Sequence, residues 1–162
     1  MTTKNSMDII GEKDIGVIEA EFANIKQSSV RAVEGGHIEM QQVGALSIDG
    51  ERVEVTQGAA GILRGNDVSL NQGISAVTVG NNTALNFSFS PMVISKGEAV
   101  ANKSAVGVMA AMNIKTENSA SVLMIANKVE GNVTTLFDWR GALALGAVFG
   151  GVWGLLSIFR RR

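Results

Sequence analysis

The chain has 162 residues, enough for one domain with a short appendage, and it contains no cysteine. The absence of cysteine excludes disulfide cross-links, thiolate metal sites and a cysteine nucleophile. A formal net charge of −1 excludes the strongly basic surface expected of a nucleic-acid-binding protein. Nineteen glycines with six phenylalanines and no tyrosine indicate a narrow interior with many tight turns.

Residues 8–127 contain a repeat of fifteen residues. Residues 53–67 read VEVTQGAAGILRGND and residues 68–82 read VSLNQGISAVTVGNN, so aliphatic, glutamine and glycine positions coincide. In rows of fifteen from Asp8, the third column is aliphatic throughout: Ile10, Ile25, Met40, Val55, Leu70, Leu85 and Val100. The eleventh column is mostly aliphatic, and the eighth changes from aliphatic to small residues. So many agreeing columns indicate a true structural repeat.

The repeat predicts an all-β fold, a β-solenoid of about eight turns over residues 8–127. Fifteen residues are too few for a helical repeat, which needs about 33 to 47. Each row would form short strands that pair with the equivalent strands one turn away. The third, eighth and eleventh columns would point inward. The thirteenth column, with Gly35, Gly50, Gly65 and Gly80, would supply the positive φ of a sharp corner. Residues 1–7 would form an N-terminal extension, and residues 128–140 a linker or cap.

Glutamine fills the fifth column in four successive rows: Gln27, Gln42, Gln57 and Gln72. Side-chain amides stacked at the strand spacing hydrogen-bond along the axis, as in the Asn/Gln ladders of stacked strands. The alternative is that these side chains merely occupy a solvated corner. We expect a structural ladder rather than a ligand-binding site.

A strip of apolar residues is predicted on the outside of the rod. If the eighth column points inward, the seventh and ninth columns point outward. The candidate contact residues in these columns are Leu46, Ile74, Phe89 and Val106. An apolar strip of this kind usually marks a contact surface, so we expect copies to associate side by side. The alternative is that the alternation slips at a corner, which would turn the strip into core.

Residues 141–159 read GALALGAVFGGVWGLLSIF and contain no charged residue. A helix of this length reaches about 28 Å, close to the thickness of a hydrocarbon core. The expected interface residues are Trp139 and Arg140 before the segment, and Arg160, Arg161 and Arg162 after it. We predict one C-terminal transmembrane helix. The alternative is a buried core helix, for which a narrow solenoid has no room.

Four small residues recur at every fourth position of this segment: Ala142, Gly146, Gly150 and Gly154. They form one stripe on a helix and allow another helix to approach closely, which predicts helix–helix packing. The alternative is that glycine is simply common in membrane helices. The three terminal arginines would favour a cytoplasmic C-terminus, which requires export of the solenoid. Because we see no N-terminal signal for export, we expect instead a single-pass C-terminal anchor with the solenoid in the cytoplasm.

The residues predict no catalytic site, metal site or cofactor. His37 is the only histidine, and a surface position is a better explanation for it than a role as general base. The acidic residues Glu12, Asp14, Glu19 and Glu21 are best explained as a solvated end of the stack.

The stack of Gly- and Val-rich turns without catalytic groups resembles the bactofilin-type polymer-forming proteins, which are β-solenoids that join end to end and associate with membranes. The sequence therefore predicts a non-enzymatic, membrane-anchored scaffold or tether that self-associates. Its partners would be membrane lipid and copies of itself, with no nucleic acid. Two alternatives are an accessory membrane-anchor subunit that docks a partner enzyme on the solenoid, and a filament-forming cytoskeletal protein.

Overall fold

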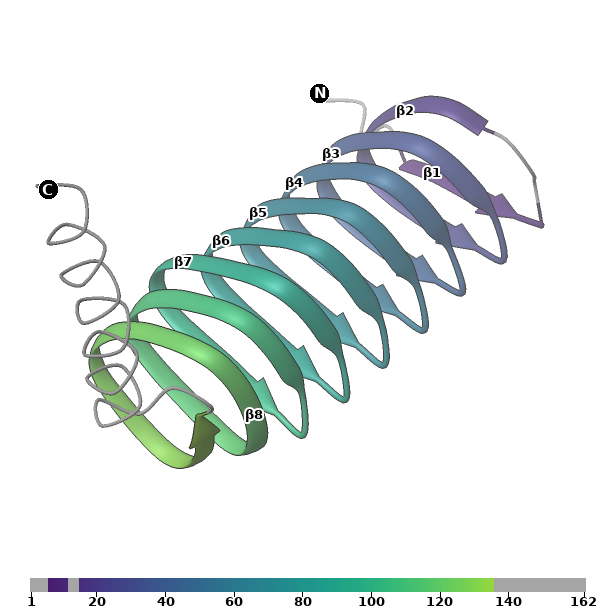
Figure 1. Cartoon of the computed structure of the whole chain (residues 1–162). Helices are drawn as coiled ribbons and strands as arrows, with labels where there is room; N and C mark the ends of the chain where they lie inside the picture. The colour runs from purple at the N-terminus through teal and green to yellow at the C-terminus, as the bar shows by residue number, and fades with distance from the viewer. Residues whose placement is uncertain (1–5, 12–14, 136–162) are drawn as a thin grey trace, which may run out of the picture.

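The protein is an all-β parallel solenoid of about seven turns, stacked along one axis (Figure 1). The computed structural model describes residues 6–11 and 15–135, with side chains described as far as residue 131. Its strands are β1 (Ser6–Ile10), β2 (Ile15–Lys26), β3 (Ser29–Gln41), β4 (Gly44–Thr56), β5 (Ala59–Asn71), β6 (Ile74–Asn86), β7 (Phe89–Asn102) and β8 (Ala105–Thr135). Each strand pairs in parallel with the next one along the chain. The predicted β-solenoid is therefore confirmed.

The number of turns is smaller than the eight predicted, because the first row of the repeat does not provide a full turn. The described part of this row contributes β1, which has only five residues and pairs with the end of β2. At the other end, β8 continues to Thr135, beyond the predicted limit of the solenoid at residue 127.

Each of the middle strands winds through nearly a whole turn, and a short break separates it from the next strand. In β5 the ladder of paired residues also skips Gly61 and Asn66, and the alternation of buried and exposed residues is interrupted there. These corners divide the turn into three stretches. We name them the first side (residues 59–60 in β5), the second side (62–65) and the third side (67–71), and their equivalents in other turns take the same names.

Ladders of like aliphatic residues fill the interior. One ladder consists of Ile25, Met40, Val55, Leu70 and Leu85, each at most 2% exposed. Burying one such side chain fully stabilises the fold by about 1.5–3 kcal/mol. Because equivalent residues in adjacent turns lie only ~4.8 Å apart, each buried side chain also packs against its own neighbours in the ladder.

The fifteen-residue register is interrupted in β7. Gly80 pairs with Ser95, but Asn82 pairs with Glu98, so β7 contains one residue more than β6 between these points. Later positions are displaced accordingly, and Ala101 rather than Val100 continues the buried ladder. At the other end Ile9 pairs with Ile25, and Ile10 is 69% exposed. The predicted inward positions of Ile10 and Val100 are therefore wrong by one residue.

The glycines of the thirteenth column do not have the predicted positive φ. Positive φ values occur at a different corner, between successive strands, where Gln27, Gln42, Gln57 and Gln72 have φ of +49° to +55°. Glycine is needed for space instead. A Cβ at Gly35 would lie 2.1 Å from the carbonyl oxygen of Ala20, and one at Gly65 would lie 2.7 Å from that of Gly50. Stacked backbones approach too closely here for any side chain.

Within the described residues, 6–11 and 15–135, no helix is long and apolar enough to cross a membrane. The predicted transmembrane segment 141–159 lies outside them, together with its glycine stripe and its flanking tryptophan and arginines. The transmembrane helix therefore stays a prediction.

Candidate functional site

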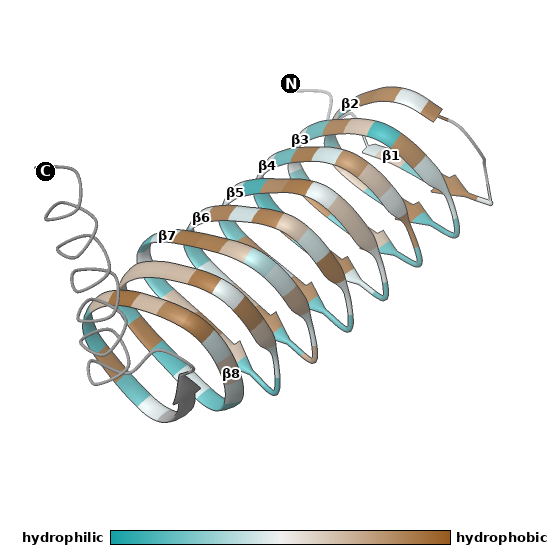
Figure 2. Cartoon of the chain, in the orientation of Figure 1, coloured by the Kyte–Doolittle hydropathy of each residue, from teal (hydrophilic) through white to brown (hydrophobic). Residues whose placement is uncertain are grey.

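The outward residues of the second side change from charged to apolar along the rod, and Figure 2 colours the ribbon by the hydropathy of each residue. One outward ladder, read turn by turn, consists of Glu19, Glu34, Asp49, Arg64, Val79, Ile94 and Ala110. The ladder is charged as far as Arg64 and apolar from Val79 onward. The inward ladder of the second side stays mainly aliphatic through the same turns, with Leu63, Val93 and Met109. Elsewhere in the C-terminal turns the interior contains many buried serines and threonines.

An exposed apolar face covers the first and second sides of the C-terminal turns. We define the apolar face as Ile74, Val77, Val79, Phe89, Met92, Ile94 and Val108. Ile74 is 56% exposed, Phe89 47% and Ile94 43%. Residues 68–95 contain no charged side chain, so no charge interrupts the face within β6 and the first half of β7. Contiguous exposed apolar surfaces of this kind mark sites of contact with a protein or a membrane.

Three of the four predicted contact residues lie on the outside. Ile74 and Phe89 are direct neighbours in the ladder and belong to the apolar face. Leu46 is 66% exposed but lies in β4, away from these two residues. The prediction for Val106 is wrong, because this side chain is only 4% exposed. The extra residue in β7 pairs Val106 with the buried Ser90, so that Ala105 takes the outward position beside Phe89.

The second-side members of the apolar face were missed at the sequence level. Val77, Val79, Met92 and Ile94 lie in the tenth and twelfth columns of the repeat. The signal was present in the twelfth column, which carries no charged residue after Arg64. Finding it required knowing that the chain turns a corner after the ninth column, where two successive residues both point outward.

The third side stays polar, and amide bonds connect successive turns at its ends. Asn86 Nδ2 donates to Asn71 Oδ1 at 2.9 Å, and Asn82 Nδ2 donates to Asp67 Oδ1 at 2.9 Å. At the neighbouring corner Asn81 Nδ2 donates to Asn66 Oδ1 at 2.8 Å. Two of these three amide bonds are exposed and the Asn86–Asn71 bond is partly buried, which is typical of a solvated polar surface and contrasts with the apolar face.

The structure joins the four glutamines of the fifth column into one ladder. Gln27 Nε2 donates to Gln42 Oε1 at 3.2 Å, and the same bond links Gln42 to Gln57 at 3.2 Å. A third bond, from Gln57 to Gln72, measures 3.1 Å. Each glutamine occupies the left-handed region, which is unfavourable for a residue with a Cβ. The amide bonds offset part of this cost along the N-terminal half of the rod.

In the C-terminal turns, serine replaces this arrangement at the same corner. Phe87, Lys103 and Asn118 occupy the positions of the glutamines, with φ values of +47° to +50°. The next residue in each turn is a buried serine: Ser88, Ser104 and Ser119. The amide of Ser88 donates to Ser104 Oγ at 3.1 Å, and Ser104 Oγ donates to the Asn102 carbonyl at 2.8 Å. The corner is therefore closed from inside by hydroxyl groups.

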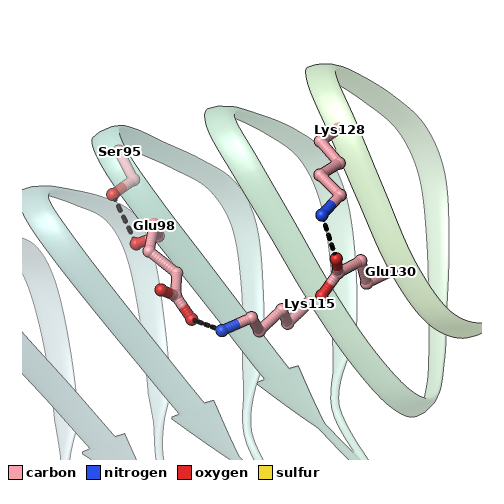
Figure 3. Close-up of polar contacts among 5 residues, drawn as sticks. All are labelled: Ser95, Glu98, Lys115, Lys128 and Glu130. Carbon is pink, nitrogen blue, oxygen red and sulfur yellow. Dashed lines mark hydrogen bonds and ion pairs between the residues drawn. The ribbon is translucent and has the colours of Figure 1, made fainter.

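Ion pairs lie on the third side of the last turns (Figure 3). Lys115 Nζ lies 2.9 Å from Glu98 Oε1, and Lys128 pairs with Glu130. The hydrogen bond that Lys115 donates to Glu98 raises the pKa of Lys115, and the bond that Lys128 donates to Glu130 lowers the pKa of Glu130. Ser95 Oγ donates to the Glu98 carbonyl at 2.7 Å beside the extra residue of β7. Because the charged groups are exposed, solvent screens these pairs. The Lys115–Glu98 pair joins β7 to β8, whereas Lys128 and Glu130 lie two residues apart within β8.

Few groups suited to chemistry come together in the described part of the chain. His37 Nε2 lies 2.9 Å from Glu39 Oε1 and is partly exposed. Glu19 and Glu21 are exposed, whereas residues 12–14 are not described. No group of three or more His, Asp or Glu side chains is placed to hold a metal among the described residues.

Comparison of the chain with protein-family models, with curated proteins and with solved structures finds no match. The parallel solenoid is consistent with a bactofilin-like architecture and compatible with a structural role. Function has to be inferred from the surfaces of the rod.

Proposed function

We propose that the protein is a non-enzymatic, membrane-anchored scaffold whose copies associate side by side through the apolar face. One observation carries the proposal: large apolar side chains are exposed in successive turns, with no charge among them. Ile74, Phe89 and Ile94 are each more than 40% exposed. Removing apolar surface from water contributes about 25 cal/mol per Å², so covering this face stabilises an assembly substantially.

The shape and composition of the face suit a second copy of the same rod. Its β-branched members Val77, Val79 and Val108 belong to a parallel sheet, and sheets pack face to face about 10 Å apart through such side chains. No charged group within the face has to lose its water when the two surfaces meet. Depletion of charge is the compositional mark of an interface core.

The uncharged segment 141–159 supports anchoring to a membrane. An anchor holds all copies in one plane and raises their effective concentration, so that a face of modest area suffices for association. The stripe of Ala142, Gly146, Gly150 and Gly154 would add helix–helix contacts inside the bilayer. In this arrangement the solenoid stands in the cytoplasm and the assembly needs neither a cofactor nor a catalytic group.

Self-association is tested by counting the copies in the detergent-extracted full-length protein with light scattering. Ile94→Lys places a charge in the face and should lower the copy number, whereas Ala84→Lys on the third side of the neighbouring turn should leave it unchanged. Circular dichroism confirms that both variants keep the fold. An unchanged copy number in Ile94→Lys contradicts association through this face. A foreign protein in stoichiometric amount indicates a docking subunit instead.

Anchoring is tested separately by extraction of cell membranes at alkaline pH. The full-length protein should stay with the lipid and require detergent for release. Gly150→Leu should keep the protein in the membrane and reduce the copy number, because it removes close approach between helices. A full-length protein that stays in the aqueous phase contradicts the anchor.

A further inference from the structure

The charged and apolar halves of the second side restrict how two copies can meet. Exposed carboxylates of Glu19, Glu34 and Asp49 occupy the outward ladder in β2–β4, and Val79, Ile94 and Ala110 occupy it in β6–β8. Each arrangement of two copies that covers the apolar half also determines which residues of the partner face the acidic half.

We infer that two copies pair in parallel, with equivalent C-terminal turns in contact and the acidic N-terminal turns apart. The inference rests on the proposed function, since it specifies how the self-associating copies are arranged. In a parallel pair the two-fold axis runs along the rods. Each turn then meets the same turn of its partner, because such an interface is isologous. Val79 and Ile94 therefore face apolar residues only.

A fully overlapping antiparallel pair is unfavourable because it opposes unlike halves. Ile94 and Val79 would then cover residues such as Glu34 and Asp49 of the other copy. Taking a carboxylate out of water without a partner costs several kcal/mol. Arg64 pairs with Asp49 at 3.5 Å within its own chain. Arg64 lies at the middle of the rod, so it does not neutralise the negative charge of Glu34.

An antiparallel pair centred on the apolar face avoids this cost but separates the C-terminal ends. The two chains would run in opposite directions, with their last turns at opposite ends of the contact. Residues 136–140, the short link to the predicted anchor, extend at most about 18 Å. A parallel pair brings both last turns to the same bilayer without requiring the rods to lie flat on it.

The N-terminal turns diverge in the parallel pair. Like charges on Glu19, Glu34 and Asp49 repel their equivalents across a narrow gap, and salt weakens this repulsion. Packed sheets also cross at about 30°, which moves the distal turns off each other. The acidic halves are thereby left as separate arms that project away from the membrane.

Cysteine cross-linking tests the arrangement, because the natural chain contains no cysteine. Single variants Val79→Cys, Ile94→Cys and Ala110→Cys are each treated with a short bis-maleimide in the full-length, detergent-extracted protein. A parallel pair should give cross-linked dimers at all three positions, at least about tenfold faster than the third-side control Ala84→Cys. Glu34→Cys should react at the slow control rate.

The alternative outcomes separate the two proposals. If just one of the three positions cross-links rapidly, the two-fold axis is perpendicular to the rods. This result overturns the parallel arrangement but is consistent with self-association. If the protein is oligomeric but all three positions cross-link only as slowly as Ala84→Cys, another surface forms the assembly. This result overturns both the parallel arrangement and the role of the apolar face. A single copy per particle refutes the proposed self-association itself.

Discussion

The N-terminal and C-terminal halves of the solenoid share one backbone path, yet they differ on the outward second side, and the C-terminal half buries many more serines and threonines. In β2–β5 the second side carries Glu34, Asp49 and Arg64, and glutamines stack on the outside of the sharp corner. In β6–β8 the same side is apolar, and serines close that corner from within. The core constrains only the inward positions, so the two halves are free to present different surfaces.

The side-chain hydrogen bonds between turns at the sharp corner are exposed in the N-terminal half and buried in the C-terminal half. Amide bonds such as Gln42 to Gln57 are exposed to water, which competes for the same groups. The hydroxyl of Ser104 is buried and satisfies both an amide and carbonyl groups of neighbouring residues. A buried hydrogen bond is costly to leave unmade, whereas an exposed one is readily replaced by water. The C-terminal half should therefore depend more strongly on its corner residues.

The largest expected loss of stability comes from disturbing the close stacking of backbones, which both halves share. Gly35→Ala would place a Cβ 2.1 Å from the carbonyl oxygen of Ala20, so two turns must move apart. We expect a loss of about 2–3 kcal/mol in the free energy of unfolding. Denaturant unfolding of the full-length protein measures it.

Gly44→Ala is the matched control, because a Cβ at Gly44 meets no atom within 4 Å. It should change the stability by less than about 0.5 kcal/mol. Equal stability of the two variants would show that the turns are not stacked as closely as described.

The second prediction compares the two corners directly. Ser104→Ala removes the acceptor of the Ser88 amide, and Gln57→Ala removes two exposed amide bonds. We expect Ser104→Ala to cost about 1–3 kcal/mol and Gln57→Ala less than about 1 kcal/mol, since only the first leaves a buried donor unpaired. Both are measured by thermal unfolding under identical conditions. A larger loss for Gln57→Ala would reverse the proposed importance of the two corners.

The third prediction concerns two threonines in β6, where the halves meet. Thr83 Oγ1 is buried without a hydrogen-bond partner in an inward ladder that continues Val68. Thr83→Val has nearly the same shape and should stabilise the fold by about 1 kcal/mol, because it removes an unsatisfied hydroxyl. Thr78→Val should destabilise it instead, since Thr78 Oγ1 lies 2.7 Å from Ser75 Oγ. Changes of the same sign in both variants would contradict this reading of the interior.

The solenoid could be predicted from the sequence because the pattern of inward aliphatic residues is repeated in every turn. Inward residues such as Ile25, Met40 and Val55 lie one above another, so the period of the chain equals the period of the structure. The extra residue in β7 was hidden because Ser104 and Ser119 resume a spacing of fifteen after it. The rows therefore appeared continuous while the inward and outward positions had exchanged.

The roles of glycine and glutamine could not be assigned from sequence for a different reason. A column of glycines has the same pattern whether it supplies positive φ or only space, and the distance from Gly35 to Ala20 exists only in three dimensions. Glutamine rarely adopts positive φ, so nothing local predicted it at Gln42 or Gln57. The second-side part of the apolar face was missed because its limits depend on the position of a corner.

The smallest expected effect concerns the ion pairs of the last turns, which have exposed groups. The bond from Lys128 holds the pKa of Glu130 below its ordinary value of 4.5. A lowered carboxyl pKa means that this pair stabilises the fold above about pH 4.5 and is lost as the pH falls through the folded-state value. The hydrogen bond that Lys115 donates to Glu98 raises the pKa of Lys115 above 10.5, so the contribution of this pair is complete below pH 10.5 and is lost as the pH rises further.

Carboxyl NMR titration of Glu130 tests the acid side of this window. Lys128→Met should raise the pKa of Glu130 toward its ordinary value, whereas Lys26→Met at the other end of the rod should leave it unchanged. Added salt should reduce the difference, because exposed charges are screened within about 10 Å at 0.1 M. An identical titration of Glu130 in Lys128→Met would show that the two groups do not interact within β8. The ion pair between β7 and β8, Lys115 with Glu98, would not be affected by that result.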